Sequence, residues 1–312
     1  MKNNVKRRAI SSGVGYAYSW ISIIMVAVVC LFIMLNVFYL GADVISVDFL
    51  TKEPDTSAMN RNAGGILTPM IGTLLLTVIG ILITMPLSIA SAVYLCYYSK
   101  DGFFKGLITT AIDILSGVPT IVVALFAVAV FTQPWLAFLS VPIGTGEGSR
   151  AYGKSFFVAG ISMAIMILPF VTKSVEQSLK TVPPEYIEGS LSLGATKWRT
   201  ISRIALLSAR PGIITGAVLG MGRIIGDTAI VWLALGGTLR MTGLQPWWQP
   251  RNWLSTLRNT GSTLTSYIFY TSPAGEGNSY EVAFGASMVL IVIILILNAA
   301  VAVLGGIGKT RR

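Results

Sequence analysis

Six long apolar stretches constrain what this chain of 312 residues can fold into. A helix needs about 20 apolar residues to cross a hydrocarbon core about 30 Å thick, and each stretch is long enough. Charged residues, which would coat a soluble core of this size, make up only 12% of the chain, against about 25% in soluble domains. We therefore predict an all-α, polytopic membrane protein with six transmembrane helices. The predicted spans cover approximately residues 18–41, 67–98, 107–131, 156–178, 211–237 and 282–306.

The distribution of basic residues predicts how these spans are oriented. With the N-terminus in the cytoplasm, the inside segments carry fourteen Lys and Arg residues and the outside segments carry seven, as the positive-inside rule requires. The apolar run of the first span exceeds the roughly 7–15 residues of a signal-peptide core, and no small-residue cleavage site follows it. We therefore expect a retained anchor helix and a multi-pass protein with both termini in the cytoplasm.

The composition excludes several classes of function. The sequence has no histidine, which is the commonest general base and the commonest zinc ligand. Cys30 and Cys96 both lie in apolar runs, so we expect no metal site, no disulfide and no catalytic residue. The formal net charge is +10, but the basic residues are spread between apolar stretches. That spacing indicates orientation in a membrane rather than binding to nucleic acid.

The spans divide the chain into three parts. Residues 1–66 hold the N-terminal tail, the first span and an outside loop, and residues 67–237 hold a core of four spans with a cytoplasmic segment at 180–210. Residues 238–312 hold an outside loop, the sixth span and a cytoplasmic tail. The outside segment 238–281 is rich in Trp and Gly. Because indole rings favour the headgroup level, we expect part of it on the membrane surface, with a docking surface for an outside partner as the alternative.

Two predicted spans carry polar side chains on one helical face. These are Thr73, Thr77, Thr84, Ser88 and Ser91 in the second span, and Thr109, Asp113, Ser116 and Thr120 in the third. Lipid tails offer such groups no partners, so each face contacts other helices or lines a wet pathway. The sequence leaves both alternatives open, and Thr77 is included among the pathway candidates.

The fifth predicted span combines a glycine face with two charges. Gly212, Gly216 and Gly220 recur at every fourth residue, and Arg223 and Asp227 project over the same roughly 80° of arc. Arg223 follows Pro211 by twelve residues, which places it about 18 Å along the helix, close to mid-membrane. A guanidinium exposed to lipid costs several kcal/mol. Arg223 therefore forms a structural ion pair with Asp227, or it binds a crossing oxyanion through its planar fork.

Lys173 and Thr228 complete the set of pathway candidates. Lys173 lies near the inner end of the fourth span and offers a second cation to an anion. The alternative is that its side chain extends to the membrane interface. Thr228 directly follows Asp227.

The cytoplasmic segment 180–210 has the pattern of a compact docking element. Pro184 is suited to the first turn of a short helix, and Gly194 allows a sharp turn after it. Trp198, preceded by Lys197, then begins a second amphipathic stretch. These features predict an exposed element that a cytoplasmic protein binds.

The same segment resembles the EAA motif of ATP-binding-cassette (ABC) importer permeases. The motif is Glu-Ala-Ala, three residues, Gly, nine residues, Ile, one residue and Leu-Pro. Here it reads Glu188-Gly189-Ser190, three residues, Gly194, nine residues, Ile204, one residue and Leu206. The chain departs from it by Gly and Ser at the two alanine positions and by Leu207 at the proline position. The resemblance assigns contact with the ATPase to Glu188, Gly189, Ser190, Gly194, Ala195, Lys197 and Trp198.

Further motifs resemble the permeases of the high-affinity phosphate uptake system. They lie at residues 64–66, 72–77, 117–120, 168–169 and 222–228, and the resemblance covers roughly residues 45–305. The short outside segment 42–66 is more similar to the A-type (PstA-like) subunit than to the C-type. This chain has Asp227 where the family usually has Glu, and Lys173 where it usually has Arg, which removes bidentate geometry.

The resemblance implies a fold, partners and cofactors. The fold is that of a type I (MetI-like) ABC importer permease with six transmembrane helices in a bacterial inner membrane. The expected partners are a second, C-type permease subunit, two copies of a cytoplasmic ATPase subunit, an external phosphate-binding protein and membrane lipid. ATP and Mg are expected on the ATPase, so this chain itself binds no cofactor.

Three other functions remain as alternatives. The same architecture could import molybdate, sulfate or phosphonate, since Arg223 and Lys173 suit any oxyanion. A stand-alone ion-coupled secondary transporter commonly has inverted repeats and broken helices, and neither is evident in the sequence. A membrane enzyme would need a cluster of catalytic acids, whereas Asp113, Glu176 and Asp227 are predicted on three different helices.

Overall fold

The computed structural model describes residues 2–54, 64–100, 102–143, 150–151, 153–239, 241–275 and 279–306. The α-helices are α1 (Lys2–Gly41), α2 (Val47–Thr51), α3 (Leu67–Val93), α4 (Phe103–Gly117), α5 (Thr120–Phe131), α6 (Phe156–Lys180), α7 (Pro184–Ser192), α8 (Lys197–Thr200), α9 (Leu206–Ser208), α10 (Arg210–Gly226), α11 (Trp253–Arg258), α12 (Leu264–Thr271) and α13 (Tyr280–Gly306). Short 3₁₀ or π segments are η1 (Ala42–Val44), η2 (Tyr94–Tyr98), η3 (Pro134–Leu139), η4 (Ile201–Ala205), η5 (Val231–Leu235), η6 (Pro250–Asn252) and η7 (Pro273–Gly275). Strands β1 (Pro142–Ile143) and β2 (Arg150–Ala151) form one antiparallel pair.

Within the residues that the structure describes, four continuous helical segments are long and apolar enough to cross a membrane. They are Gly15–Val44, Leu67–Tyr98, Phe156–Lys180 and Tyr280–Val303, and they correspond to the first, second, fourth and sixth predicted spans. Two bent helix pairs in the described part of the chain bring the number of candidate spans to six if each pair counts as one span. The bent pairs are α4 with α5, at 106°, and residues Lys197–Ser208 with α10, at 66°.

The third predicted span, 107–131, is not one continuous helix. It breaks after Gly117, and Val118 takes an extended conformation with φ −73° and ψ 128°. Pro119 explains the break, because proline restricts the preceding residue to extended conformations and cannot donate a backbone hydrogen bond. Thr109 and Asp113 therefore lie on a different helix from Thr120, and the predicted polar face of this span is divided.

The fifth predicted span, 211–237, is also interrupted. α10 ends at Gly226, and Asp227 is extended, with φ −79° and ψ 132°. Helical structure resumes at residue 229 and continues through η5. Asp is a favoured residue at helix N-caps, where it adopts this non-helical conformation. The prediction that Arg223 and Asp227 occupy one face of a single helix is therefore wrong.

The core is built mainly from α3, α6 and α10. α6 packs extensively against α3 and α10 and also contacts α4, α5 and η5. The polar face predicted on the second span lies inside this packing: the Thr84 hydroxyl donates to the Ala164 carbonyl of α6 at 3.4 Å, and the Thr172 hydroxyl of α6 donates to Ser88 Oγ at 3.1 Å. In the described structure this face serves helix packing, which was one of its two predicted roles.

The glycine face of α10 allows it to approach α6 closely. A Cβ atom added at Gly216 would lie 3.1 Å from Ser174 Oγ, tighter than nearly all real Cβ contacts. Ser178 Oγ also donates to the Ala209 carbonyl at 2.8 Å. The glycines therefore form a packing seam, like the small-residue interfaces common between membrane helices.

Gly216→Val is expected to destabilise the protein, because the added side chain overpacks the α6–α10 seam. Overpacking costs about 1–3 kcal/mol, so the apparent Tm of the purified protein should fall. Gly222→Ala is the matched control, since nothing lies within 4 Å of a Cβ added at Gly222. An unchanged Tm for Gly216→Val would contradict the close approach of the two helices.

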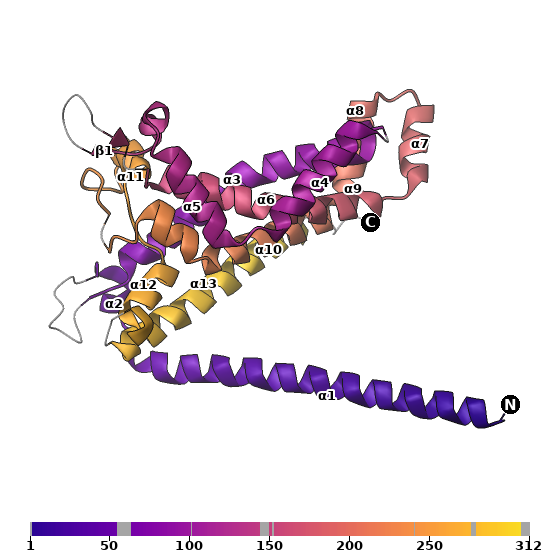
Figure 1. Cartoon of the computed structure of the whole chain (residues 1–312), viewed down its shortest axis with the longest axis horizontal. Helices are drawn as coiled ribbons and strands as arrows, with labels where there is room; N and C mark the ends of the chain where they lie inside the picture. Colours follow the sequence, from indigo (N-terminus) through magenta and orange to yellow (C-terminus); the bar gives the residue numbers. More distant parts are fainter. Residues whose placement is uncertain are drawn as a thin grey trace.

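α1 projects away from the other helices (Figure 1). It contacts α13 and η1, and the most apolar window of its span Gly15–Val44 has no buried residue. The N-terminal end of α1, the C-terminal part of α13 and α7 all lie toward one end of the molecule, whereas α2, α11, α12 and β1 lie toward the other (Figure 1). The predicted cytoplasmic tail from residue 307 lies outside the described residues.

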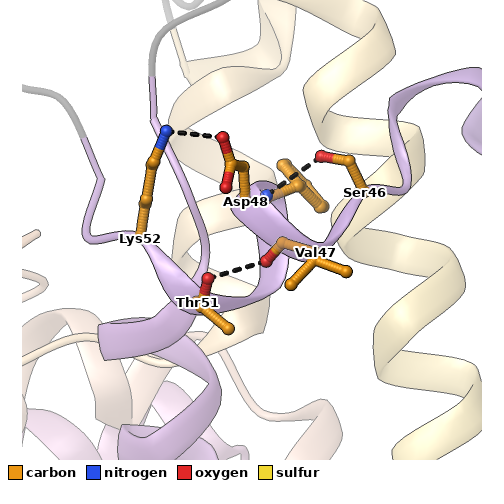
Figure 2. Close-up of polar contacts among 6 residues, drawn as sticks. Ser46, Val47, Asp48, Thr51 and Lys52 are labelled. Carbon is orange, nitrogen blue, oxygen red and sulfur yellow. Dashed lines mark hydrogen bonds and ion pairs between the residues drawn. The ribbon is translucent and has the colours of Figure 1, made fainter.

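The segment after α1, which the sequence predicts to lie outside, is ordered by a single helical turn, α2. Ser46 Oγ accepts a hydrogen bond from the Phe49 backbone N–H at 3.1 Å, and Lys52 pairs with Asp48 at 2.6 Å (Figure 2). The Thr51 hydroxyl donates to the Val47 carbonyl at 2.7 Å. These contacts point the Phe49 ring into a second core cluster with Leu264 and Tyr267.

Candidate functional site

Arg223 lies exposed on α10 and reaches toward α6. Its guanidinium carbon is 5.4 Å from the centroid of the Phe170 ring, which is within the range of an attractive cation–π contact. Phe170 is itself partly exposed, at 40%. Among the described residues no carboxylate lies within ion-pair distance of Arg223. Asp227 interacts with Arg223 electrostatically, but only beyond ion-pair distance. The predicted alternative of a structural ion pair with Asp227 is therefore not found, and the guanidinium N–H groups have no carboxylate partner among the described residues.

Asp227 has a structural role at the break after α10. One carboxylate oxygen accepts a hydrogen bond from the Ile230 backbone N–H at 2.8 Å, and the side chain of Thr120, at the start of α5, also faces this carboxylate. The Asp227 backbone carbonyl accepts from the Thr265 hydroxyl at 3.4 Å. Asp227 is buried, at 9% exposure. It thus caps the next helical turn and brings α10, α5 and α12 together.

Asp227→Ala is expected to destabilise the protein by about 1 kcal/mol, the usual cost of losing an N-cap. Asp227→Asn keeps an oxygen acceptor and should retain most of this stability. Thermal unfolding of the two purified variants separates capping from charge. Equal Tm values for Asp227→Ala and the unchanged protein would contradict the capping role.

Lys173 forms an ion pair between two helices. Its ammonium lies 2.6 Å from a carboxylate oxygen of Asp113, on α4, and the two side chains are 46% and 55% exposed. Lys173 lies three residues after Phe170, so both side chains share one face of α6. α4, α6 and α10 therefore form one exposed face that carries Arg223, Phe170, Lys173 and Asp113. We call this the α4–α6–α10 face.

The other predicted pathway residues are placed differently. Thr77 is buried, and its hydroxyl donates to the Thr73 carbonyl at 2.7 Å, so it is not on the α4–α6–α10 face. Thr228 is exposed next to the break, and its carbonyl accepts from the Trp232 N–H at 2.9 Å.

The sequence analysis placed Asp113 on a polar face that either packs against helices or lines a pathway, without pairing it with Lys173, and it did not single out Phe170. A carboxylate in an apolar helix is a signal in itself, because it is costly in lipid. Phe170 gives no such signal, since an aromatic residue in a membrane helix usually packs against lipid or other helices.

The segment between α6 and α10 has the predicted form of a helix, a glycine turn and a second helix. α7 ends in a turn in which Gly194 has φ +82°, a left-handed conformation that favours glycine. The Ser190 and Thr200 hydroxyls lie 2.9 Å apart and join α7 to α8. Lys197 lies 4.7 Å from the Tyr98 ring centroid, and Trp198 is 62% exposed. We call residues 184–200 the α7–α8 element.

The remaining residues predicted to contact an ATPase also lie in the α7–α8 element. Glu188 and Gly189 are exposed on α7, and the Ala195 N–H donates to the Ser190 carbonyl at 3.2 Å. Nothing lies within 4 Å of a Cβ added at Gly189. The element therefore presents an open surface at the end of the molecule toward which the N-terminal end of α1 and the C-terminal part of α13 point (Figure 1).

The Trp-rich segment lies at the opposite end of the molecule. Trp247 packs against the core, whereas Trp248 and Trp253 are more than half exposed. The Trp253 indole N–H donates to the Trp248 carbonyl at 3.1 Å. Exposed indoles suit either a membrane surface or an outside partner, and both predictions remain open.

Among the described residues there is no group of three or more Cys, Asp or Glu side chains placed to hold a metal ion.

Comparison with known proteins shows which family has this arrangement. Residues 84–307 match the family described as "Binding-protein-dependent transport system inner membrane component". The chain is 29% identical to phosphate transport system permease protein PstA 1 of Mycobacterium tuberculosis over 250 residues, which cover 80% of this chain and 72% of that protein. It is 28% identical to the probable ABC transporter permease protein YqgI of Bacillus subtilis over 268 residues, covering 85% of each.

Solved structures show the same fold. A chain of a bacterial alginate ABC transporter, in complex with an alginate-bound periplasmic protein, aligns with a TM-score of 0.61 at 19% identity, covering 92% of this chain and 91% of that one. A chain of the MetNI methionine ABC transporter aligns with a TM-score of 0.53 at 16% identity, covering 77% and 92%. The predicted all-α, type I permease fold is confirmed. The chain belongs to the family of binding-protein-dependent transport system inner membrane components, and is a multi-pass permease subunit of an ABC transporter rather than an enzyme.

Proposed function

We propose that this chain is one of two transmembrane subunits of an ATP-driven importer that moves inorganic phosphate into the cytoplasm. The names of its relatives support phosphate as the cargo, since both PstA-type and PstC-type phosphate permeases of mycobacteria are similar to it. The residue that carries the proposal is Arg223. Its guanidinium is exposed within a membrane helix and has no carboxylate within ion-pair distance among the described residues.

The α4–α6–α10 face requires a polar or protein neighbour. Arg223 follows the start of α10 by thirteen residues, about 20 Å along the helix. Contact of its charge with lipid would cost several kcal/mol. We propose that this face meets a second permease subunit of the C-type, so that the two subunits enclose the pathway and Arg223 donates two parallel hydrogen bonds to the passing anion.

The α7–α8 element supplies the proposed link to the ATPase. It is exposed, it carries the residues of the EAA motif, and it lies at the same end of the molecule as the N-terminal end of α1 (Figure 1). We propose that this end is cytoplasmic, as the basic residues predict, and that two ATPase subunits bind ATP and Mg there. ATP-driven closure would then switch the permeases between inward-open and outward-open states, after an external binding protein delivers phosphate.

The experiment that tests the proposal begins with co-purification in detergent. We expect a second six-span permease and an ATPase to co-purify with this chain. Proteoliposomes containing the complex should take up radiolabelled phosphate only with ATP and the binding protein. Excess unlabelled sulfate or molybdate should compete poorly. Strong competition by either anion would change the assigned cargo, and uptake by the isolated chain without ATP would refute the proposal.

A further inference from the structure

The ion pair between Lys173 and Asp113 has an unusual position. It joins α6, which is largely buried, to α4, in which no residue is buried. The pairs Asp48–Lys52 and Glu176–Lys180, by contrast, each join residues four apart in the sequence. The Lys173–Asp113 pair is therefore a tertiary contact at the edge of the core.

The exposure of this pair shows what kind of environment surrounds it. Lys173 lies seven residues before the end of α6, about 10 Å along the helix, and about half of each side chain is accessible. Charges at this depth face protein or water rather than lipid. An ion pair in contact with water is weakly held and exchanges readily with other ions, unlike a buried pair.

The two cations of the α4–α6–α10 face have different partners. Arg223 contacts the Phe170 ring, which leaves its hydrogen-bond donors available. Lys173, one helical turn along α6 from Phe170, is neutralised by Asp113. The face therefore carries one net positive charge from these three ionised groups, and it would carry two if the carboxylate were absent.

We infer that Asp113 is a displaceable counter-ion that competes with the transported oxyanion for Lys173. This inference rests on the proposed function. When an anion reaches Lys173, it replaces the carboxylate as the partner of the ammonium, and the polar contact between α4 and α6 opens. When the anion leaves, Asp113 returns to Lys173. Asp113 thereby positions Lys173 and keeps the pathway from holding the anion too tightly.

Equilibrium binding of radiolabelled inorganic phosphate tests this inference. The sample is the detergent-purified complex of both permeases and the ATPases, without binding protein or nucleotide. Asp113→Asn should bind phosphate about fivefold more tightly than the unchanged complex, because Lys173 no longer has a competing partner. In proteoliposomes the same variant should show a lower maximal uptake rate, because the anion leaves more slowly.

A gain in affinity separates this role from a structural one, since damage to the fold would only weaken binding. Glu176→Gln is the matched control, because it removes the carboxylate from the equally short pair with Lys180 on α6. It should leave phosphate affinity unchanged. If Asp113→Asn binds no more tightly than the unchanged complex, or if Glu176→Gln gains as much, the inference is wrong.

A second comparison uses the double variant, in which neither charge of the pair is left without its partner, so it can be made even if Asp113→Asn alone does not assemble. Lys173→Gln leaves the Asp113 carboxylate unpaired, so it should bind phosphate more weakly than Asp113→Asn, Glu176→Gln or the unchanged complex. Adding Asp113→Asn in that background should restore part of the affinity, and no restoration would overturn the inference. Failure of the proposed function is distinguishable, because it would appear as absence of ATP-dependent phosphate uptake by the unchanged complex.

Discussion

Arg223→Ala is expected to reduce phosphate uptake by about 100-fold while the complex still assembles and hydrolyses ATP. The guanidinium is the group on the α4–α6–α10 face that offers several N–H donors without a carboxylate partner among the described residues. A pair of charge-assisted hydrogen bonds to an oxyanion contributes about 3 kcal/mol, which corresponds to roughly this factor. Its removal should leave helix packing intact, because the side chain is exposed.

The measurements are ATP-dependent phosphate uptake in proteoliposomes, ATPase activity and co-purification of the subunits. Arg223→Lys should have an intermediate rate, since lysine keeps the charge and loses the planar fork. Lys52→Ala is the control, because it removes an exposed cation next to α2 (Figure 2). Lys52 is remote in sequence from α4, α6 and α10, the helices that form this face. Full uptake by Arg223→Ala would remove this residue from the pathway.

Gly194→Val is expected to detach the ATPase from the permease. Gly194 has φ +82°, and nothing lies within 4 Å of a Cβ added there, so the effect of Val is conformational rather than steric. A β-branched residue held in this region costs about 1–3 kcal/mol, and the turn would therefore change its direction. α7 and α8 could then no longer present their surfaces together to an ATPase.

Co-purification of the ATPase and uptake measurements test this prediction. Gly194→Asn is the matched control, because Asn tolerates left-handed conformations far better than Val; it should retain the ATPase. Charge reversal at Lys197 and Arg199 together gives an independent variant that leaves the turn unchanged, and it should also weaken the association. If Gly194→Val still co-purifies the ATPase in full, the α7–α8 element is not the attachment site.

The long apolar runs predicted the membrane spans well because hydropathy over 20 residues is a strong signal. The interruptions were missed for local reasons. Pro119 and Asp227 each belong to a short motif that breaks or caps a helix, and such motifs carry little weight within a long apolar window. The broken helices also show that helix interruption does not distinguish this family from secondary transporters, whereas the family match does.

The candidate site was predictable in part. A charge in an apolar helix is costly in lipid, so Arg223 and Lys173 stood out from the sequence alone. The pairing of each cation with its partner did not, because the contacts with Phe170 and Asp113 depend on how α4, α6 and α10 pack. Thr77 had the same polar character as a pathway residue, but its hydroxyl is satisfied within α3. Periodicity identifies a polar face without showing what covers it.

The short connection between α6 and α7 has a mechanical consequence. Three residues separate Lys180 from Pro184; two of them are Val182, which is buried against the core, and Pro183, whose backbone is stiff. This connection therefore allows little movement of α7 relative to α6. A displacement of α7 is therefore transmitted to α6 as a rigid body, and Phe170 and Lys173 move together with it.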